Sequence, residues 1–128
     1  DITENDAKHY WIECPQRTYV GIYSGQIVGT YYIKPNQPGL GSHICNMGFV
    51  VSSERRGLGT GTKLAQHAFD AAKKLGFHAI QANLVVSTNT KAIKLWESLG
   101  FSIIGTIPDG FNLHSKNFVD AFIMYKKL

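Results

Sequence analysis

Three glycines at alternating positions follow an arginine in the stretch Arg56-Gly57-Leu58-Gly59-Thr60-Gly61. The short segment Ser52 to Arg55 separates this stretch from the apolar run Phe49-Val50-Val51. Glycine tolerates positive φ and close backbone approach, so successive N–H groups can point at a single anion. A helix that begins here adds the partial positive charge of its N-terminus. The planar guanidinium of Arg56 matches phosphate oxygens. The stretch predicts an anion-binding loop; a loop shaped only by turn geometry is the alternative.

The spacing of this loop excludes two familiar phosphate-binding motifs. A P-loop has four residues between its glycines and then Lys-Ser or Lys-Thr, whereas three residues separate Gly57 from Gly61, and Thr62 precedes Lys63. A dinucleotide fingerprint has two residues between its second and third glycines, and only Thr60 stands there. Neither motif is therefore present.

A second block runs from Asn89 to Phe101, with the sequence Asn-Thr-Lys-Ala-Ile-Lys-Leu-Trp-Glu-Ser-Leu-Gly-Phe. Asn89 is placed to cap a helix, and that role alone could explain it. Ala92 is small where a ligand or strand can pass close by. Gly100 ends the helix, and the next strand follows.

The hydrophobic patterns predict an α/β (α+β) fold in which helices flank a mixed, mostly antiparallel sheet. A helical stripe (Leu64, Ala68, Ala71, Ala72, Leu75) marks the long helix. The expected elements are a short helix within 1–14, strands at 18–23, 26–34, 43–51, 79–86, 102–107 and 119–125, and helices at 61–75 and 89–99. A loop containing Pro108 and Gly110 is expected between the last two strands.

The composition is that of a globular protein, and we expect one domain over residues 1–128. The formal charge is +4, and the only dense basic groups are the pairs Arg55-Arg56, Lys73-Lys74 and Lys126-Lys127, so no nucleic-acid partner is expected. The excess positive charge suits a polyanionic small molecule. No apolar run is long enough to span a membrane, and Asp1 to Asp6 is unlike a signal peptide. Cys14 and Cys45 are predicted to be free thiols, with no metal site, in a reducing compartment such as the cytoplasm.

The two blocks together resemble the GCN5-related N-acetyltransferase (GNAT) family. Arg56-x-x-Gly59-x-Gly61 is similar to its R/Q-x-x-G-x-G/A motif, and Asn89-x-x-Ala92-x-x-Leu95-Trp96-x-x-x-Gly100-Phe101 to its N-x-x-A-x-x-L-Y-x-x-x-G-F motif. Within the family, Tyr31-Tyr32-Ile33-Lys34-Pro35-Asn36 and His43-Ile44-Cys45-Asn46-Met47-Gly48-Phe49 resemble the fungal proline-analogue (azetidine-2-carboxylate) acetyltransferase branch.

The resemblance implies that acetyl-CoA is the co-substrate and that it lies between the strands 43–51 and 79–86. The backbone of Phe49, Val50 and Val51 would contact the pantetheine arm and the thioester. Arg56 to Gly61 would hold the pyrophosphate, and Asn89 would contact the pantetheine. The amine of a small molecule would attack the thioester directly, and a homodimer is one assembly to consider.

The chain also departs from the family pattern. No carboxylate lies within 43–51, so the catalytic candidates are His43, Asn46 and Asn83. The resemblance to the proline-analogue branch implies that the two amides position an amino acid or proline analogue, or a water. The alternatives are that either Asn satisfies backbone groups where the strands separate and that His43 is an exposed histidine at a strand end. Trp96 stands where many members have a tyrosine that protonates the leaving thiolate. Only about seventeen residues precede the first expected hairpin, so the N-terminal elements are expected to be shortened. A CoA-binding module without catalysis and a protein or peptide N-acetyltransferase are the alternatives.

Overall fold

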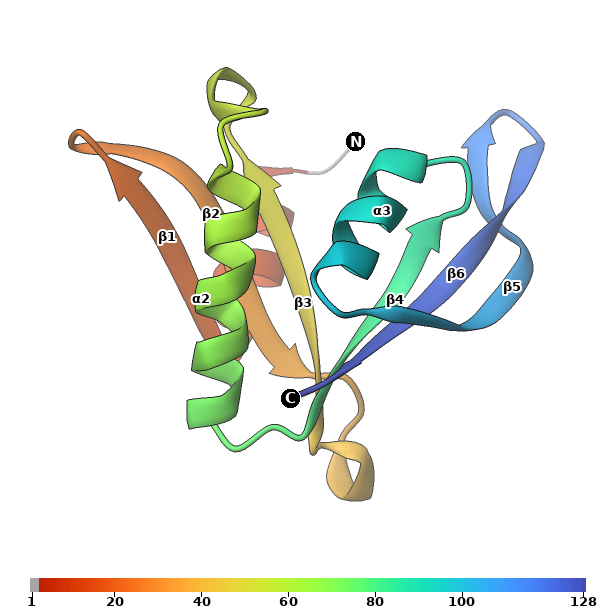
Figure 1. The fold of residues 1–128 in the computed structure, drawn as a ribbon, viewed down its shortest axis with the longest axis horizontal. Coiled ribbons are helices and arrows are strands. Elements are labelled where there is room, and N and C mark those ends of the chain that lie inside the picture. The colour runs from red at the N-terminus through yellow and green to blue at the C-terminus, as the bar shows by residue number, and fades with distance from the viewer. Residues whose placement is uncertain (1–2) are drawn as a thin grey trace. The chain divides into compact units, whose positions relative to one another are not determined.

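The computed structural model describes residues 3–128, which form two compact units divided between His78 and Ala79. Asp1 and Ile2, part of the expected N-terminal helix, lie outside the described residues. Each unit combines an antiparallel sheet with helical elements, and this confirms the α+β class (Figure 1). That the whole chain forms one domain stays a prediction.

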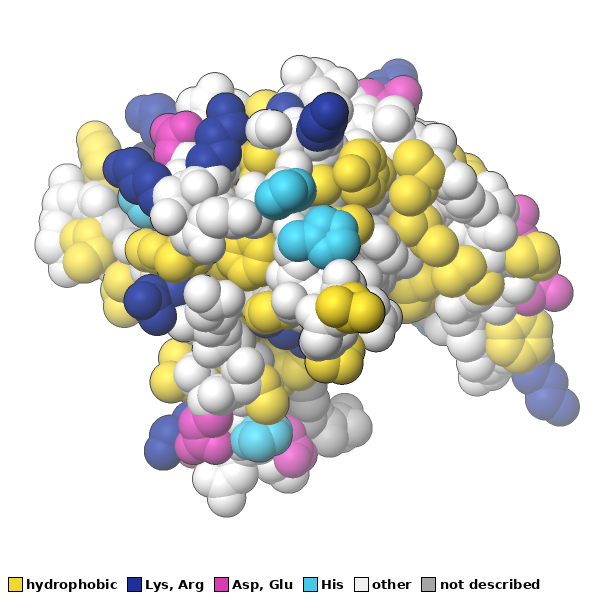
Figure 2. Space-filling model, turned by 90° about the horizontal axis from the view of Figure 1, so that it is seen from below, with side chains coloured by type: hydrophobic (Ala, Val, Ile, Leu, Met, Phe, Trp, Pro, Cys, Tyr) yellow, Lys and Arg dark blue, Asp and Glu magenta, His cyan; other side chains and the backbone are white. Residues whose placement is uncertain are grey.

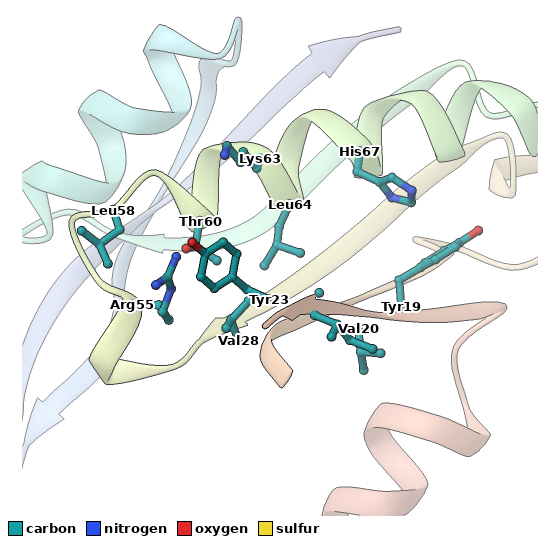
Figure 3. Close-up of a pocket in the computed structure, with 12 residues that line it drawn as sticks. Tyr19, Val20, Tyr23, Val28, Arg55, Leu58, Thr60, Lys63, Leu64 and His67 are labelled. Atoms are coloured by element: carbon teal, nitrogen blue, oxygen red, sulfur yellow. The ribbon is translucent and has the colours of Figure 1, made fainter. Parts of the chain in front are cut away.

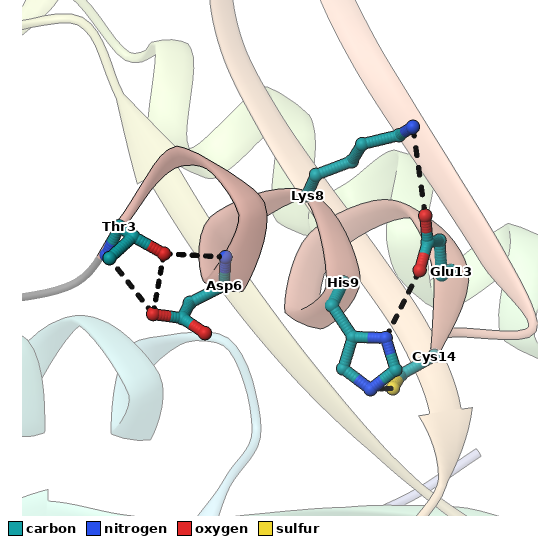
Figure 4. Close-up of polar contacts among 6 residues, drawn as sticks. All are labelled: Thr3, Asp6, Lys8, His9, Glu13 and Cys14. Carbon is teal, nitrogen blue, oxygen red and sulfur yellow. Dashed lines mark hydrogen bonds and ion pairs between the residues drawn. The ribbon is translucent and has the colours of Figure 1, made fainter.

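The first unit begins with the helix α1 (Glu4–Lys8) and the π-helical turn η1 (His9–Glu13), where one helix was expected. The Thr3 hydroxyl accepts a hydrogen bond from the Asp6 amide at 3.1 Å, and the Asp6 carboxylate accepts from the Thr3 amide at 3.2 Å (Figure 4). Hydrogen bonds from Thr3 lower the pKa of the Asp6 carboxyl group. This reciprocal pair is a capping box that fixes the start of α1.

Three antiparallel strands follow: β1 (Arg17–Tyr23), β2 (Gln26–Pro35) and β3 (Ile44–Val51). Ser24 and Gly25 join β1 to β2 with φ angles of 50° and 76°, as a two-residue hairpin turn requires. A 3₁₀ turn, η2 (Gly39–Gly41), lies between β2 and β3. The strands predicted at 18–23, 26–34 and 43–51 are thus confirmed to within one residue at each end.

The helix α2 (Thr60–Lys74) follows the 3₁₀ turn η3 (Ser53–Arg55) and packs against β2 and β3. Four residues of the expected apolar stripe, Leu64, Ala68, Ala71 and Ala72, are buried together with Ala65, whereas Leu75 follows the last helical residue and is only partly buried. Gly76 follows the helix with φ of 88°, the left-handed conformation that ends many helices. The helix therefore begins and ends within one residue of its predicted bounds.

Two adjacent tyrosines of β2 point to opposite faces of the sheet, because side chains alternate along a strand. The Tyr31 hydroxyl is 2.6 Å from Nδ1 of His67 on α2. Tyr32 packs edge-on against Trp11 of η1, with ring centroids 5.0 Å apart. Both tyrosines are buried, and so is Cys45, whose thiol pKa is raised to about 12 by burial. The core of this unit therefore has one face under α2 and another under η1 (Figure 1).

The second unit comprises β4 (Ala79–Val86), α3 (Thr90–Ser98), β5 (Ser102–His114) and β6 (Asn117–Lys127). The strands pair antiparallel in the order β4–β6–β5, so β5 is an edge strand. Met124 and Ala121 of β6 are fully buried. No helix among residues 3–128 has the length and apolar character needed to span a bilayer.

The prediction of a loop at Pro108 and Gly110 is wrong, because β5 continues through both residues. The pairing of β5 with β6 shifts register between Ile107 and Phe111, and this bulge accommodates both residues. Proline is tolerated on an edge strand, where its missing N–H need not leave a gap in the ladder. The Asp109 amide instead donates to a carboxylate oxygen of Asp120 at 3.1 Å, and the chain turns later, at Ser115-Lys116.

Candidate active site

The loop between β3 and α2 turns at two glycines in the left-handed region. Gly57 has φ of 77° and Gly59 has φ of 79°. A Cβ atom at either position would meet nothing within 4 Å, so the space beside both residues is open. The side chain of Arg56 is exposed at the start of this turn. The loop thus presents backbone and a cation to a space that a ligand can enter.

The N-terminus of α2 offers backbone donors without acceptors inside the helix. Gly59 is the N-cap residue and has no side chain that could cap the helix. The first helical bond runs from the Lys63 amide to the Gly59 carbonyl at 3.1 Å. The amides of Thr60, Gly61 and Thr62 precede that bond and have no helical acceptor. Such a helix end, with its partial positive charge, is suited to a phosphate.

The end of β3 leads into this loop. Val51 is paired with Gly29 of β2, and Phe49 with Tyr31, whose ring centroid is 5.5 Å from that of Phe49. Val50 is half exposed. Because N–H and C=O groups alternate in direction along a strand, some of those in Phe49–Val51 point away from β2. The structure thus brings these residues and the glycine loop into one continuous segment of the first unit.

Asn46 is one of two buried polar residues, with Thr60, among the described residues. Its amide oxygen accepts a hydrogen bond from the Tyr32 hydroxyl at 3.2 Å. The Tyr32 hydroxyl also lies 2.9 Å from that of Tyr10, and because Tyr32 has a single proton, Tyr10 donates to it. A chain of hydroxyls from η1 and β2 therefore holds the Asn46 oxygen.

The Tyr32 hydroxyl remains a donor at any physiological pH. Burial raises its pKa well above the ordinary value for tyrosine, and the hydrogen bond and charge of Tyr10 raise it further. Gly48, paired with Tyr32, leaves room for this ring: a Cβ atom there would lie 2.5 Å from its Cε1. The close packing fixes the ring, and the ring fixes the amide of Asn46.

Lys34 stands directly opposite Asn46 in the β2–β3 pairing, so their side chains share a face. Its ammonium nitrogen lies 5.0 Å from the ring centroid of Tyr10 and 5.3 Å from that of Tyr32, which is cation–π distance. We call Tyr10, Tyr32, Lys34 and Asn46 the Asn46 cluster. It joins an amide to a cation that forms no ion pair among the described residues, a combination suited to a carboxylate.

The other predicted site residues lie apart from the Asn46 cluster or in the second unit. His43 is exposed just before β3; its carbonyl accepts from the His78 amide at 2.9 Å, and its ring packs on that of His78. Asn83 is exposed on β4, where the pairing with β6 shifts register, and its oxygen accepts from Gln81 at 3.1 Å. Asn89 caps α3 through the Ala92 amide at 3.2 Å, as its position predicted.

Sequence reasoning missed Tyr10, Tyr32 and Lys34. Lys34 lies opposite Asn46 through the register of β2 with β3, and neither strand alternates regularly between buried and exposed residues, so no local pattern fixes this pairing. No local pattern signals Tyr10, since its contact with Tyr32 joins residues 22 positions apart.

The first unit thus combines an uncapped helix start after a strand with a separate polar cluster around Asn46. The model of the acetyltransferase (GNAT) family matches residues 2–101. The chain therefore belongs to the acetyltransferase (GNAT) family, a family that uses acetyl-CoA.

Individual relatives agree with this assignment. The N-acetyltransferase aca1 of Schizosaccharomyces pombe is 46% identical over 98 residues, which are 76% of this chain and 47% of the relative; the chain thus spans about half of that protein. A GCN5-related N-acetyltransferase from Kribbella flavida is 40% identical with a TM-score of 0.91, over 100% of this chain and 79% of the other. The Salmonella typhimurium protein yncA, solved with its cofactor acetyl-CoA, shares the fold at 24% identity and a TM-score of 0.85. That match covers 98% of this chain and 75% of the other.

The loop fits the anionic part of acetyl-CoA on two grounds. The amides of Thr60, Gly61 and Thr62 have no acceptor inside the helix. Gly57 and Gly59 have no side chain, so the space beside them stays open for a ligand. The guanidinium of Arg56 adds a permanent charge. The fit rests on backbone geometry, so it depends on glycine at these positions.

Alanine substitution tests the backbone requirement in the absence of any ligand. Gly59→Ala should destabilise the protein by about 1 kcal/mol, because a residue with a Cβ atom resists the left-handed conformation. Gly61→Ala, two residues on but inside α2, should leave stability unchanged or raise it by up to about 1 kcal/mol, since alanine favours helix. Its Cβ atom would lie 3.8 Å from Val51, an ordinary contact. Urea unfolding measures both; equal effects would contradict the loop geometry.

Proposed function

We propose that this chain catalyses transfer of the acetyl group of acetyl-CoA to the amine of a small molecule, with an amino acid or proline analogue as the leading acceptor class. The observation that carries the proposal is the uncapped start of α2 beside Gly57, Gly59 and Arg56. Acetyl-CoA supplies an activated acetyl thioester. The residues of this chain bind it, orient the acceptor and manage the proton.

The donor half of the site lies in the segment from Phe49 to Gly61. The α2 amides and Arg56 bind the pyrophosphate, whose oxygens take up the donors that the helix leaves without acceptors. Backbone groups of Phe49 to Val51 bind the pantetheine arm, and an N–H group there stabilises the oxyanion, a contribution of roughly 3–4 kcal/mol where one such donor is removed. Asn89, the cap of α3, stays our candidate for a further pantetheine contact.

The acceptor half uses the Asn46 cluster. The Lys34 ammonium group supplies charge attraction for a carboxylate, and the Asn46 amide supplies hydrogen bonds in a direction set by Tyr32. An amino or imino acid carries this carboxylate next to its amine, so binding the acid group fixes the nucleophile. Asn83 remains a second positioning candidate.

The reaction proceeds by direct attack of the neutral amine on the thioester carbonyl, without a covalent enzyme intermediate. Cys45 is not suited to be a nucleophile, because it is fully buried and its thiol pKa is raised to about 12. A water held by Asn46, or the exposed imidazole of His43, accepts the amine proton. The Trp96 indole donates only its N–H and is no acid, so the thiolate leaves unassisted or with a proton from water.

Two other functions stay as alternatives. A module that binds CoA without catalysis would share the loop and lack turnover; the absence of a carboxylate within 43–51 favours it. A peptide N-acetyltransferase would share the donor half and accept an N-terminal amine. We also propose a cytoplasmic location and consider a homodimer.

Turnover on a panel of acceptors tests the proposed function. Thiol release from acetyl-CoA, measured with amino acids, cyclic imino acids, polyamines and short peptides, should be fastest with an amino or imino acid.

Arg56→Gln should weaken acetyl-CoA binding about tenfold, since a charge-assisted hydrogen bond is lost. Arg17→Gln, an exposed arginine of β1, is the matched control and should bind as the parent does. Tight binding without release for any acceptor would instead favour the CoA-binding module.

The Asn46 cluster is tested by the same assay on the best acceptor. Asn46→Ala should raise the KM for the acceptor about tenfold or more, because a hydrogen bond to a charged group is lost. Tyr32→Phe should have a smaller effect in the same direction. In both variants the acetyl-CoA Kd should stay within about twofold of the parent value. Asn112→Ala, at an exposed asparagine of β5, is the control; if Asn46→Ala leaves the acceptor KM unchanged, the placement of the acceptor is wrong.

A further inference from the structure

A cavity of about 360 Å³ lies in the first unit between α2 and the strands β1 and β2. Its strand side is formed by Tyr19–Tyr23 and Val28, and its helix side by Thr60, Lys63, Leu64 and His67, with Arg55 and Leu58 at one end (Figure 3). This volume is within the range of small-molecule sites, at its lower end. None of the residues predicted for catalysis lines the cavity.

The cavity exists because β1 carries a glycine where α2 passes over it. A Cβ atom at Gly21 would approach Cδ2 of Leu64 to 3.1 Å, so a larger residue would close the space between strand and helix. Tyr19 and Tyr23 flank this glycine on the same face of β1, two residues away on either side. The glycine thus separates two aromatic walls.

One end of the cavity is positively charged. Arg55 and Lys63 are the charged side chains of the lining, and no carboxylate lines the cavity. The Arg55 guanidinium lies over the Tyr23 ring, 4.4 Å from its centroid, and its Nε is buried without a hydrogen-bond partner. Neither cation forms an ion pair among residues 3–128. A bound anion would compensate both charges.

The other end is flat and aromatic. The Tyr19 ring stacks on Tyr31 with centroids 5.0 Å apart and an interplanar angle of 19°. His67 meets Tyr19 edge-on at 5.4 Å, and its Nδ1 is engaged by the Tyr31 hydroxyl at 2.6 Å. These contacts hold the rings in place, so they form a preorganised wall against which a planar ring can pack.

We propose that this cavity is a second ligand site, which binds a small monoanion with a flat apolar ring. The anionic group lies at Arg55 and Lys63, and the ring lies against Tyr19. The cavity borders the loop assigned to acetyl-CoA and shares Leu58 and Thr60 with it, whereas its other lining residues belong to β1, β2, α2 and Arg55, and Arg56, Gly57 and Gly59 do not line it. Two adjacent arginines thus serve different ligands, with Arg55 held on Tyr23 and Arg56 exposed in the loop.

The probe for this site is 2-naphthoate, whose fluorescence reports binding. It should bind saturably, and about tenfold more tightly than the neutral 2-naphthylmethanol or the cationic 2-naphthylmethylammonium, because only the carboxylate forms charge-assisted hydrogen bonds. Saturating acetyl-CoA should change the Kd of 2-naphthoate by no more than about twofold. Absence of saturable binding, equal binding of the three probes, or displacement by acetyl-CoA would each overturn the proposal.

Variants locate the probe. Lys63→Gln should weaken 2-naphthoate binding about tenfold while 2-naphthylmethanol binding is unchanged, since the lost interaction is with the charge. Lys74→Gln, on the same helix but outside the lining, is the matched control. Gly21→Ala narrows the cavity and should weaken both probes, with circular dichroism confirming the fold. If Lys63→Gln and Lys74→Gln bind 2-naphthoate equally, the site is elsewhere.

Discussion

The rest of the site depends on the backbone N–H groups at the start of α2, which have no acceptor inside the helix. A helix leaves its first amides without partners, and most helices satisfy them with a capping side chain. Here the N-cap is Gly59, which supplies none, and its φ of 79° turns the backbone so that the space beside it stays open. By contrast, α1 is closed by Thr3 and Asp6 in a reciprocal pair. The helices α1 and α3 are thus capped by side chains of this chain, whereas α2 has no capping side chain.

The strand β2 divides the two halves of the proposed reaction. Its adjacent residues Tyr31 and Tyr32 point to opposite faces, one toward α2 and the other toward η1. The α2 face holds the donor loop and the second cavity, and the η1 face holds the Asn46 cluster. A change of register by one residue would exchange the two faces, so the pairing of β2 with β3 keeps Asn46 beside Lys34.

Hydrophobic side chains also reach the surface, as the yellow atoms in Figure 2 show. In the first unit the exposed hydrophobic residues include Ile22 and Ile27, beside the turn between β1 and β2.

Local patterns predicted much of this structure. The apolar stripe of α2, its left-handed Gly76 and the strands β1 to β4 follow periodicities that depend on near neighbours in sequence. The predicted loop at Pro108 failed because tertiary pairing at a sheet edge absorbs a proline that local rules treat as a break. The glycine loop could be predicted from the sequence because its left-handed backbone conformation selects glycine. The Asn46 cluster could not be predicted, because long-range contacts assemble it and no local signal marks Tyr10.

The most direct test of the central claim is to follow the backbone amides of the isotopically labelled protein by NMR during titration with acetyl-CoA. The account predicts that the amides of Gly59, Thr60, Gly61 and Thr62 shift strongly, because they exchange water for phosphate oxygens. Acetylpantetheine, which lacks the pyrophosphate, should leave these four amides nearly unmoved. If acetyl-CoA binds while these amides stay in place, or if acetylpantetheine shifts them equally, the start of α2 does not hold the pyrophosphate.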